Sequence, residues 1–375
     1  MCSGSRRWSP SSVGADRREA RQAALRERLV AQGLDLLLVQ SLPNIRYLTG
    51  FTGSSALLAV RAHDAVLVTD FRYAVQAPRE VGNVARVEVD QVNIWDRLKR
   101  VLGERVSGSF GFEAHVATVR ERERIGALQP RVEWEATADL VEQLRAIKDP
   151  AEIDAIRAAA ALAQAAIAEL LPTVRVGDSE FAIAARLESA LRVRGSEWHP
   201  FPTIVASGPR AALPHARTSA RTLEPGDWLL LDFGAQVDGY CADLTRTVIV
   251  GGRAEARQRE VYEVVRQAQR RAIEHVRAGM TGREADGLAR DVIVRAGFGE
   301  AFGHSLGHGL GLEVHEGPRL SPTADQPIPA GAVVTVEPGI YLPGWGGVRL
   351  EDDLHLATAG PELLSDNRVE LLELV

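Results

Sequence analysis

The stretch DFGAQVDGYCADLTRT, residues 232–247, decides the fold that this sequence predicts. It follows an apolar run at 228–231 and leads into another at 248–250. Two apolar segments around a polar centre predict two neighbouring strands. The centre, Asp238-Gly239, is typical of a tight turn, because both residues tolerate positive φ. The stretch therefore predicts an antiparallel hairpin with a two-residue turn.

This hairpin carries carboxylates where a buried strand usually has apolar side chains. With a two-residue turn, Asp232 faces Thr245, and Asp243 lies diagonally opposite Asp232 on the same face of the sheet. Burial of a carboxylate is unfavourable unless a partner compensates its charge. Either the two carboxylates reach one cation together, or they cap turns and pair with Arg246. Both interpretations stay open at this point.

Length and composition limit the classes of protein that fit. The 375 residues suggest two domains, and a hydrophobic fraction of 45% is sufficient for real cores. A net charge of −6 argues against general nucleic-acid binding, which usually needs a basic face. Two cysteines, Cys2 and Cys241, exclude a disulfide framework and a cysteine zinc cluster. We therefore expect a protein of the reducing cytoplasm.

The first twenty residues are polar and rich in arginine, and they lack the apolar core of a secretory signal. We expect residues 1–20 to form a disordered extension. No apolar stretch is long enough to cross a bilayer. The alanine-rich run at 158–171 is interrupted by Gln164 and Glu169, which predicts a helix of a soluble protein. The sequence therefore indicates no membrane association.

Residues 21–147 alternate between helix and strand patterns, which predicts an α/β domain. Residues 34–39 form a continuous apolar run that is typical of a buried strand. The other predicted elements are helices at 21–33, 94–102 and 118–128 and strands at 56–60, 65–69 and 109–113.

Residues 148–375 form the second predicted domain, which opens with a clear helix start. Asp149 is a capping residue, Pro150 suits the first turn, and Glu152 has the spacing of a capping box. Two helices are followed by strands, and this order occurs twice, which indicates an internal pseudo-twofold repeat. The later predicted elements are helices at 179–193, 254–277 and 281–297, a strand at 201–206 and the hairpin.

Three of the nine histidines stand within twelve residues, in HSLGHGLGLEVHE at 304–316. Glycines on both sides of His308 allow backbone segments to approach closely, which is typical of a ligand site. A lone histidine is usually an ordinary core or surface residue, but a group of three favours a site. His304, His308 and His315 are therefore candidate functional residues.

Two glutamates near the C-terminus extend this group. Glu337 follows the buried-strand pattern AVVTV at 332–336, so an ordinary surface role is difficult to assign to it. Glu351 stands in GGVRLEDDL at 346–354, where it could also be a simple surface charge. Tyr341 stands four residues after Glu337 in the sequence, and we assign to it no role beyond packing.

Asp232, Asp243, His308, Glu337 and Glu351 together form a candidate metal-binding set. Two divalent cations would balance its four carboxylates. Oxygen-rich ligation with one imidazole suits Mn²⁺, with Co²⁺ or Zn²⁺ as alternatives, better than it suits a structural zinc. Paired metal ions lower the pKa of a shared water and polarise a carbonyl, which serves hydrolysis.

The motifs, in their chain order, resemble the pita-bread metallopeptidases, and within them the Xaa-Pro branch of prolidases and aminopeptidases P. Besides the hairpin they are LPNIRYLTGFTGSSALLAV at 42–60, IVASGPRAALPHA at 204–216, GHGLGLEVHE at 307–316, TVEPGIY at 335–341 and GVRLED at 347–352. The resemblance covers nearly everything from about Arg21 onward. It implies a creatinase-like α/β domain at 21–147, followed by a pita-bread catalytic domain at 148–375, an α/β (α+β) fold.

The resemblance also implies a division of labour among the five ligands. Asp232 would chelate one metal ion, and His308 and Glu337 would hold the other. Asp243 and Glu351 would bridge both ions. Glu337 would also handle the proton of the attacking water.

Three further residues match family histidines, and Arg349, two residues before Glu351 on the same strand face, is a fourth catalytic candidate. His215, His304 and His315 would surround the substrate, stabilise the oxyanion or transfer protons. Arg349 would orient Glu351 or meet a substrate carboxylate; alternatively it only neutralises local acid.

The function that the resemblance implies is metal-dependent hydrolysis of the bond between an N-terminal residue and proline in short peptides. The enzyme would be an Xaa-Pro dipeptidase or an Xaa-Pro aminopeptidase, a cytoplasmic homodimer without nucleic-acid or membrane partners. One alternative is a creatinase-like hydrolase that needs no metal. The other is a binding protein on the same fold without catalysis. Relatives of both kinds tend to lack the full ligand set, which is present here.

Overall fold

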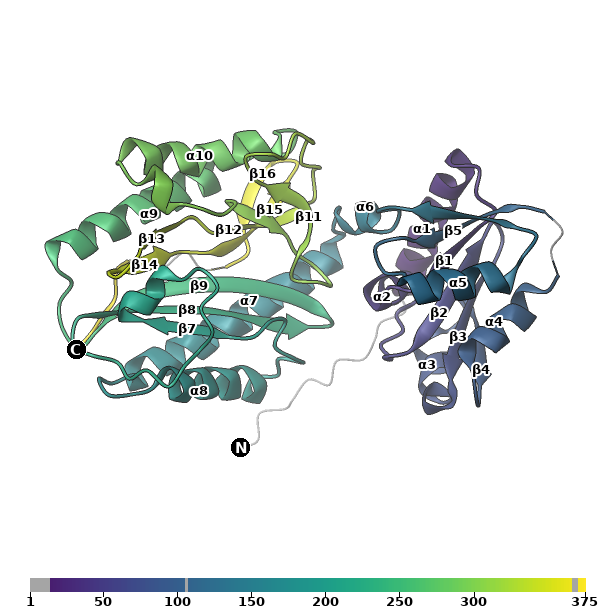
Figure 1. The fold of residues 1–375 in the computed structure, drawn as a ribbon, viewed down its shortest axis with the longest axis horizontal. Helices are drawn as coiled ribbons and strands as arrows, with labels where there is room; N and C mark the ends of the chain where they lie inside the picture. The colour runs from purple at the N-terminus through teal and green to yellow at the C-terminus, as the bar shows by residue number, and fades with distance from the viewer. Residues whose placement is uncertain (1–13, 105–106, 366–369) are drawn as a thin grey trace, which may run out of the picture. The chain divides into compact units, whose positions relative to one another are not determined.

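The structure is a computed structural model that describes residues 14–104, 107–365 and 370–375 (Figure 1). The chain divides into two compact units, Met1–Arg145 and Ala146–Val375. This boundary lies close to the one expected at residue 147. Both units mix helices with sheets, as the α/β (α+β) prediction requires.

The first unit is built on one six-stranded sheet with the strand order β4-β3-β2-β1-β5-β6. Strand β1 is buried throughout, as its apolar run predicts, and β2 and β3 form the expected antiparallel pair. The strands are β1 (Leu36–Val39), β2 (Ala56–Arg61), β3 (Ala65–Asp70), β4 (Arg86–Asp90), β5 (Ser109–Glu113) and β6 (Glu133–Thr137). The helices are α1 (Gly14–Ala31), α2 (Leu42–Thr49), α3 (Gln76–Val81), α4 (Ile94–Leu102), α5 (Val119–Leu128) and α6 (Glu142–Arg145).

The prediction of a disordered extension over residues 1–20 is wrong for its last part, because α1 begins at Gly14. Arg18 lies in that helix, and its Nη1 donates at 2.6 Å to the carbonyl oxygens of both Thr49 and Glu80. These contacts hold the first turns of α1 on the domain, and only the tertiary structure provides their acceptors. Residues 1–13 lie outside the described residues.

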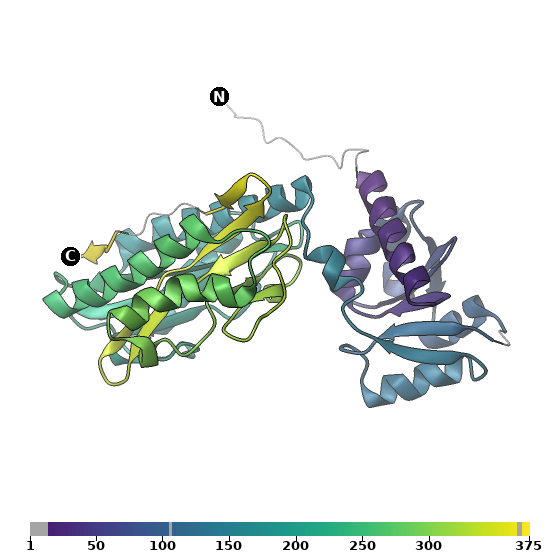
Figure 2. The same cartoon turned by 90° about the horizontal axis from the view of Figure 1, so that it is seen from above.

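The second unit repeats one arrangement, a pair of helices over a sheet (Figure 1). Helices α7 (Pro150–Leu170) and α8 (Glu180–Val193) pack on the sheet β17-β9-β8-β7. Helices α9 (Ala256–His275) and α10 (Gly282–Arg295) lie alongside each other over the strands of the second half (Figure 2). This order supports the pseudo-twofold repeat that the sequence indicates.

The strands of this unit form three sheets, with orders β17-β9-β8-β7, β11-β10-β12-β15-β16 and β13-β14. Strand β7 begins at Ile204 rather than at residue 201, and Pro202, which has no backbone N–H, precedes it. The strands are β7 (Ile204–Ser207), β8 (Asp227–Val237), β9 (Tyr240–Val250), β10 (Gly307–Gly309), β11 (Glu316–Leu320), β12 (Val333–Val336), β13 (Gly339–Leu342), β14 (Gly346–Arg349), β15 (Asp352–Ala357), β16 (Gly360–Leu363) and β17 (Glu373–Leu374).

Helix α7 starts as its sequence predicts. The carboxylate of Asp149 accepts from the backbone N–H groups of Ala151 and Glu152, at 2.9 and 3.0 Å. In return the carboxylate of Glu152 accepts from the backbone N–H of Asp149 at 2.8 Å, which completes the capping box.

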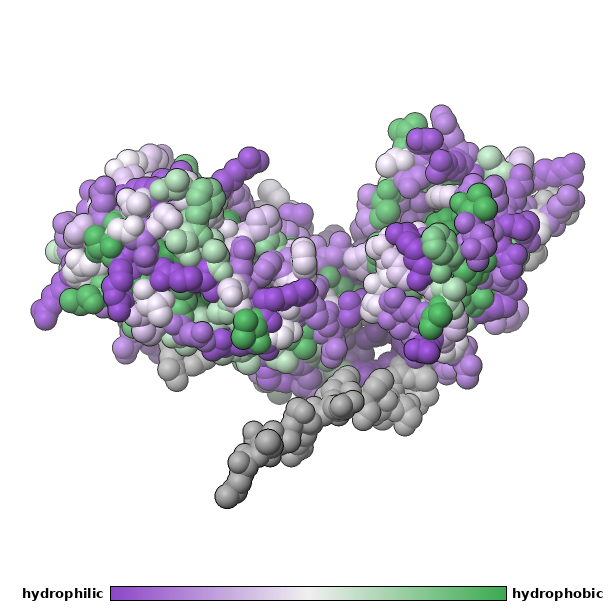
Figure 3. All heavy atoms as spheres, turned by 90° about the horizontal axis from the view of Figure 1, so that it is seen from below, coloured by the Kyte–Doolittle hydropathy of each residue, from purple (hydrophilic) through white to green (hydrophobic). Residues whose placement is uncertain are grey.

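Among the described residues, one helical segment, Pro150–Thr173, is long and apolar enough to cross a membrane by length and composition alone. One face of the helix, with Ala159, Ala160, Ala163 and Ala166, is fully buried in the core that α7 shares with β8 and β9, and alanines of the opposite face are exposed. Packing within the unit thus accounts for its apolar character. On the face drawn in Figure 3, hydrophobic residues stand in scattered groups among hydrophilic ones.

Candidate metal centre

The hairpin of β8 and β9 has the predicted geometry. Its turn consists of Asp238 and Gly239, with φ of 50° and 79°, and both residues have the positive φ of a tight hairpin turn. Asp232 pairs with Thr245 across the ladder, and Asp243 pairs with Gly234. The two aspartates therefore lie on one face, diagonal to each other, as expected.

His308 reaches the same centre from β10, the short strand between β11 and β12. A Cβ on Gly307 would stand 2.0 Å from the carbonyl oxygen of Thr335, and one on Gly309 would stand 2.1 Å from that of Gly317. No real side chain fits at such distances. The two glycines therefore permit the backbone approach that places His308 in the sheet.

Two turns in the second half place the glutamates. Glu337 follows β12 directly, and its backbone N–H donates to the carbonyl oxygen of Leu306 at 2.8 Å. Glu351 lies between β14 and β15, where it forms an isolated bridge with Thr245 of β9. The hairpin of the first half and the strands of the second half thus meet at the side chains that the sequence singles out.

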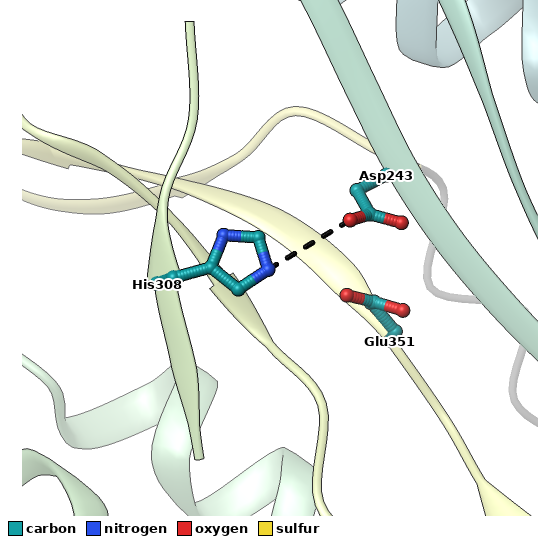
Figure 4. Close-up of side chains that lie close together, drawn as sticks. All are labelled: Asp243, His308 and Glu351. Carbon is teal, nitrogen blue, oxygen red and sulfur yellow. Dashed lines mark ion pairs between the residues drawn. The ribbon is translucent and has the colours of Figure 1, made fainter. Parts of the chain in front are cut away.

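Three of the five candidate ligands form a compact group. The ligand atoms of Asp243, His308 and Glu351 all lie within 4.8 Å of one another, and Figure 4 shows the imidazole facing both carboxylates. The Nε2 atom of His308 is 3.8 Å from Oδ2 of Asp243 and 3.4 Å from Oε1 of Glu337. Glu337 therefore joins the group through His308.

Asp232 lies beside this group and forms an ion pair with Arg349. Its Oδ2 accepts from Nη2 of Arg349 at 2.5 Å. The second oxygen, Oδ1, is buried and has no hydrogen-bond partner among the described residues, and the same is true of Oδ1 of Asp243. Buried polar atoms are normally paired. Two unpaired carboxylate oxygens at one centre are what a bound cation would satisfy.

The electrostatics of the centre point the same way. Burial raises the pKa of Asp243 and Glu351 well above the usual range, and neighbouring carboxylates raise it further. Burial likewise raises the pKa of Asp232, and it raises that of Glu337 to about 8. A set of carboxylates that suppress one another's ionisation is suited to divalent cations, which would reverse the effect.

His308 has the protonation state of a ligand. Burial lowers its pKa to about 4, so the imidazole is neutral at pH 7. Its Nδ1 lies 3.0 Å from the carbonyl oxygen of Gly309, which assigns the proton to Nδ1. The lone pair of Nε2 therefore faces the carboxylates, as in histidine ligands whose other nitrogen donates to a carbonyl. The donor set fits divalent cations.

Two threonines, not singled out from the sequence, support the glutamates. Oγ1 of Thr245 donates to Oε2 of Glu351 at 2.5 Å, and Oγ1 of Thr335 donates to Oε1 of Glu337 at 3.2 Å. Thr245 stands two residues after Asp243 on the same strand face, so the alternation of the strand was a usable signal. Thr335 stands two residues before Glu337, so the same spacing was a usable signal there.

Arg349 pairs with an acid of the centre, in keeping with the alternative that it neutralises local charge. Its guanidinium pairs with Asp232 rather than with Glu351, and it also donates to the hydroxyl of Tyr341 at 2.9 Å. That hydroxyl lies 2.8 Å from Nε2 of His304. Tyr341, to which the sequence assigned only packing, therefore connects Arg349 with His304.

The other ring nitrogen of His304 shows which group donates in the hydrogen bond between His304 and Tyr341. Nδ1 of His304 lies 2.8 Å from the carbonyl oxygen of Ser305, which assigns the ring proton to Nδ1. Burial lowers the pKa of His304 to about 4 and raises that of Tyr341 to about 12. The Tyr341 hydroxyl therefore stays protonated and donates to Nε2 of His304.

The other two predicted histidines border the centre. The rings of His308 and His315 lie 4.4 Å apart between centroids. His215 and His315 are exposed, and both are near enough to Asp232 to lower the pKa of that carboxyl. All nine predicted site residues thus lie at or around one centre in the second unit.

Comparison with known proteins identifies the fold. The model of metallopeptidase family M24 matches residues 154–358, and that of the creatinase/prolidase N-terminal domain matches residues 21–147. An uncharacterized peptidase of Bacillus subtilis is 40% identical over 350 residues, which are 91% of this chain and 96% of the relative.

Two solved structures cover almost the whole chain. An Xaa-Pro dipeptidase from Bacillus anthracis has a TM-score of 0.90 and 37% identity, and covers 95% of this chain and 99% of its own. An X-Pro aminopeptidase from Thermotoga maritima has a TM-score of 0.86 and 37% identity, and covers 94% of this chain and 99% of its own. These findings confirm the predicted resemblance and fold class: the chain belongs to metallopeptidase family M24 and carries a creatinase/prolidase N-terminal domain.

Proposed function

We propose that this enzyme hydrolyses the bond between an N-terminal residue and proline in short peptides, with two divalent metal ions. The observation that carries the proposal is the set of five candidate ligand side chains at one centre. Solved relatives at 37% identity are an Xaa-Pro dipeptidase and an X-Pro aminopeptidase. A creatinase-like hydrolase or a binding protein would not require this full set.

The metal ions would be held by Asp232, Asp243, His308, Glu337 and Glu351. Bound there, they would lower the pKa of a shared water and polarise the substrate carbonyl. We propose Mn²⁺ as the ion used, with Co²⁺ and Zn²⁺ as alternatives, because four carboxylates and one imidazole form an oxygen-rich set.

The remaining residues bind the substrate and move protons. Glu337 is the carboxylate nearest to the neutral His308, at 3.4 Å, and we assign to it the proton of the attacking water. Arg349, through Tyr341, holds His304 with its Nδ1 proton fixed on Ser305. Both ring nitrogens of His304 are engaged in this arrangement, so we assign to its ring a place beside the substrate rather than a proton donor's role.

Proline explains why such a site is needed. It has no backbone N–H, and its ring fixes φ, so enzymes that bind substrates as extended strands handle Xaa-Pro bonds badly. A centre surrounded by His215, His304 and His315 holds the free amine and the carbonyl without a donor from proline. We propose that dipeptides are the preferred substrates.

Three matched peptides test this assignment. With Mn²⁺ present, Ala-Pro should be cleaved at least about 100-fold faster in kcat/KM than Ala-Ala, a difference of about 3 kcal/mol in transition-state binding. Ala-Pro-Ala should be cleaved more slowly than Ala-Pro. Equal rates on Ala-Ala and Ala-Pro would remove the proline claim. A faster rate on the tripeptide would assign the enzyme as an aminopeptidase P.

Alanine substitution of single histidines separates ligands from substrate-facing groups. His308→Ala should weaken metal binding by about 100-fold or more, whereas His304→Ala and His315→Ala should change it less than about threefold. Isothermal titration of the metal-free variants with Mn²⁺ measures all three. If the three variants lose affinity equally, the assignment of roles is wrong.

We further propose that the chain is a cytoplasmic homodimer. The warrant is the family to which it belongs and the low cysteine content. Light scattering at micromolar concentration should give twice the mass of one chain. A single-chain mass would refute the dimer and leave the proposed chemistry unaffected.

A further inference from the structure

Two of the proposed substrate-facing histidines lie on irregular segments. His215 follows the short helical turn Gly208–Ala212, in the connection from β7 to β8. His304 lies between the turn Gly299–Ala301 and β10. Neither residue belongs to a strand whose ladder would fix its backbone. Their positions therefore depend on contacts from other elements.

The segment of His215 is held by one buried carboxylate. Glu180, the first residue of α8, is fully buried. Its Oε1 accepts from the backbone N–H and the hydroxyl of Ser207, both at 2.8 Å, and its Oε2 accepts from those of Ser219, at 3.0 and 2.6 Å. Nε of Arg210 lies 3.2 Å from both oxygens.

These contacts close a loop. Ser207 and Ser219 stand on either side of His215, and both are bound to the same carboxylate group. Hydrogen bonds to an ionised acceptor are stronger than neutral ones, and burial strengthens them further. Glu180 therefore ties together the two ends of the segment whose middle carries His215.

The segment of His304 is held by the equivalent helix of the other half. Asp286 of α10 is buried, and its Oδ1 accepts from the backbone N–H of Leu306 at 3.0 Å. The same carboxylate binds Nε and Nη2 of Arg290, at 2.6 and 2.9 Å. Arg290 in turn donates to the carbonyl oxygens of Phe302 and His304, both at 2.8 Å.

The two halves thus share one arrangement of contacts, made by different residues. In each half, a buried acid on the second helix pairs with an arginine and holds the backbone around a histidine. Glu180 binds both ends of its segment itself, whereas Asp286 binds Leu306 and its partner Arg290 binds Phe302 and His304. Glu180 and Asp286 touch neither the candidate metal ligands nor each other's loop in the contacts described above. Maintenance of the fold alone would not require both acid–arginine pairs to hold a segment that carries a histidine.

We propose that Glu180 and Asp286 are positioning residues, which fix His215 and His304 respectively for the reaction. The proposal rests on the proposed function, since it assumes that both histidines face the substrate. A displacement of about 1 Å in a catalytic group can reduce the rate about 100-fold. The two acids therefore affect turnover without contact with substrate or metal.

Two charge-removing variants, Glu180→Gln and Asp286→Asn, test the proposal, each as the control for the other. Each amide places an N–H₂ group where the carboxylate accepted hydrogen bonds. In the Mn²⁺-loaded enzyme with Ala-Pro, kcat should fall about 10-fold to 100-fold in both variants. KM should stay within about threefold, and the metal content should be unchanged. Glu152 is a buried acid at the start of α7 that accepts from the Asp149 backbone and the Tyr240 hydroxyl, and Glu152→Gln should keep kcat within about twofold of the wild type.

Hydrogen exchange supplies a measurement that needs no substrate. Glu180→Gln should speed exchange in residues 208–218 and leave residues 302–306 unchanged, and Asp286→Asn should do the reverse. If a variant fails to fold, Ser219→Ala replaces Glu180→Gln and Arg290→Met replaces Asp286→Asn. Both leave the acid in place, and we expect smaller losses of kcat of the same pattern.

The outcomes distinguish failure of the proposed function from failure of the positioning role. A wild-type chain that cleaves no Xaa-Pro peptide refutes the proposed function, while hydrogen exchange still tests both anchors. Folded variants with wild-type kcat overturn the positioning role, even if exchange in the loops changes. Loss of protection in both loops in each variant also overturns it, because the acids would then stabilise the unit as a whole.

Discussion

Asp243→Asn should lower kcat/KM by about a thousandfold or more and reduce the bound metal from about two ions per chain to one or fewer. The expected loss corresponds to about 4 kcal/mol of transition-state stabilisation. Asp243 belongs to the group with His308 and Glu351, and its Oδ1, unpaired among the described residues, is available to a cation. Asparagine has the same shape but one oxygen and no charge, so it cannot bridge two ions.

The same substitution should leave the fold intact. The backbone N–H of Asp243 donates to Oδ2 of Asp353 at 3.2 Å, and this bond does not involve the substituted side chain. Removal of one charge from a buried group of like charges should also make the metal-free variant at least as stable as the metal-free wild type.

Elemental analysis after Mn²⁺ loading, steady-state kinetics and thermal unfolding measure these effects. Asp238→Asn is a matched control, because it makes the same change in the turn of the same hairpin and asparagine tolerates the positive φ there. The control should keep both metal ions and full activity. An Asp243→Asn enzyme that retains two ions and near wild-type kinetics would show that the bridging role is wrong.

Exhaustive chelation should abolish the activity, and added Mn²⁺ should restore it. Chelation should also lower the thermal stability, because the metal ions bind the native centre and not the unfolded chain. Binding at a concentration 1,000 times the dissociation constant contributes about 4 kcal/mol to the free energy of unfolding. Full activity after chelation would refute the metal-dependent mechanism and favour a metal-free hydrolase.

The metal-free chain should also lose stability as the pH rises. Burial raises the pKa of Glu337 from 4.5 to about 8 in the folded chain. Between these values the folded state holds a proton that the unfolded state has released, so the free energy of unfolding falls with increasing pH. Thermal unfolding from pH 6.5 to 8 measures this, because below pH 6.5 the buried His304 and His308, whose pKa burial lowers to about 4, change the stability in the opposite direction. Bound Mn²⁺ should weaken the dependence, since it favours the ionised carboxylate.

The sequence by itself determined the local elements and singled out the candidate ligands. The hairpin followed from Asp238-Gly239 and its flanking apolar runs, because turn residues and alternation act over a few positions. The start of α7 followed from Asp149 and Glu152 for the same reason. Asp232, Asp243 and Glu337 could be singled out because a carboxylate in an apolar strand is unfavourable without a partner.

Only the tertiary structure decided which side chains meet across the chain. Arg349 and Asp232, which form an ion pair, lie 117 positions apart in the sequence. Tyr341 and His304, which share a hydrogen bond, lie 37 positions apart. Helix α1 begins at Gly14 because Arg18 finds acceptors at Thr49 and Glu80, 31 and 62 positions away. Glu180 and Asp286 look like ordinary helix acids in the sequence. Their role depends on packing, which brings a distant backbone segment to a buried carboxylate. Such contacts leave no periodic or local signal in the sequence, so the sequence could not predict them.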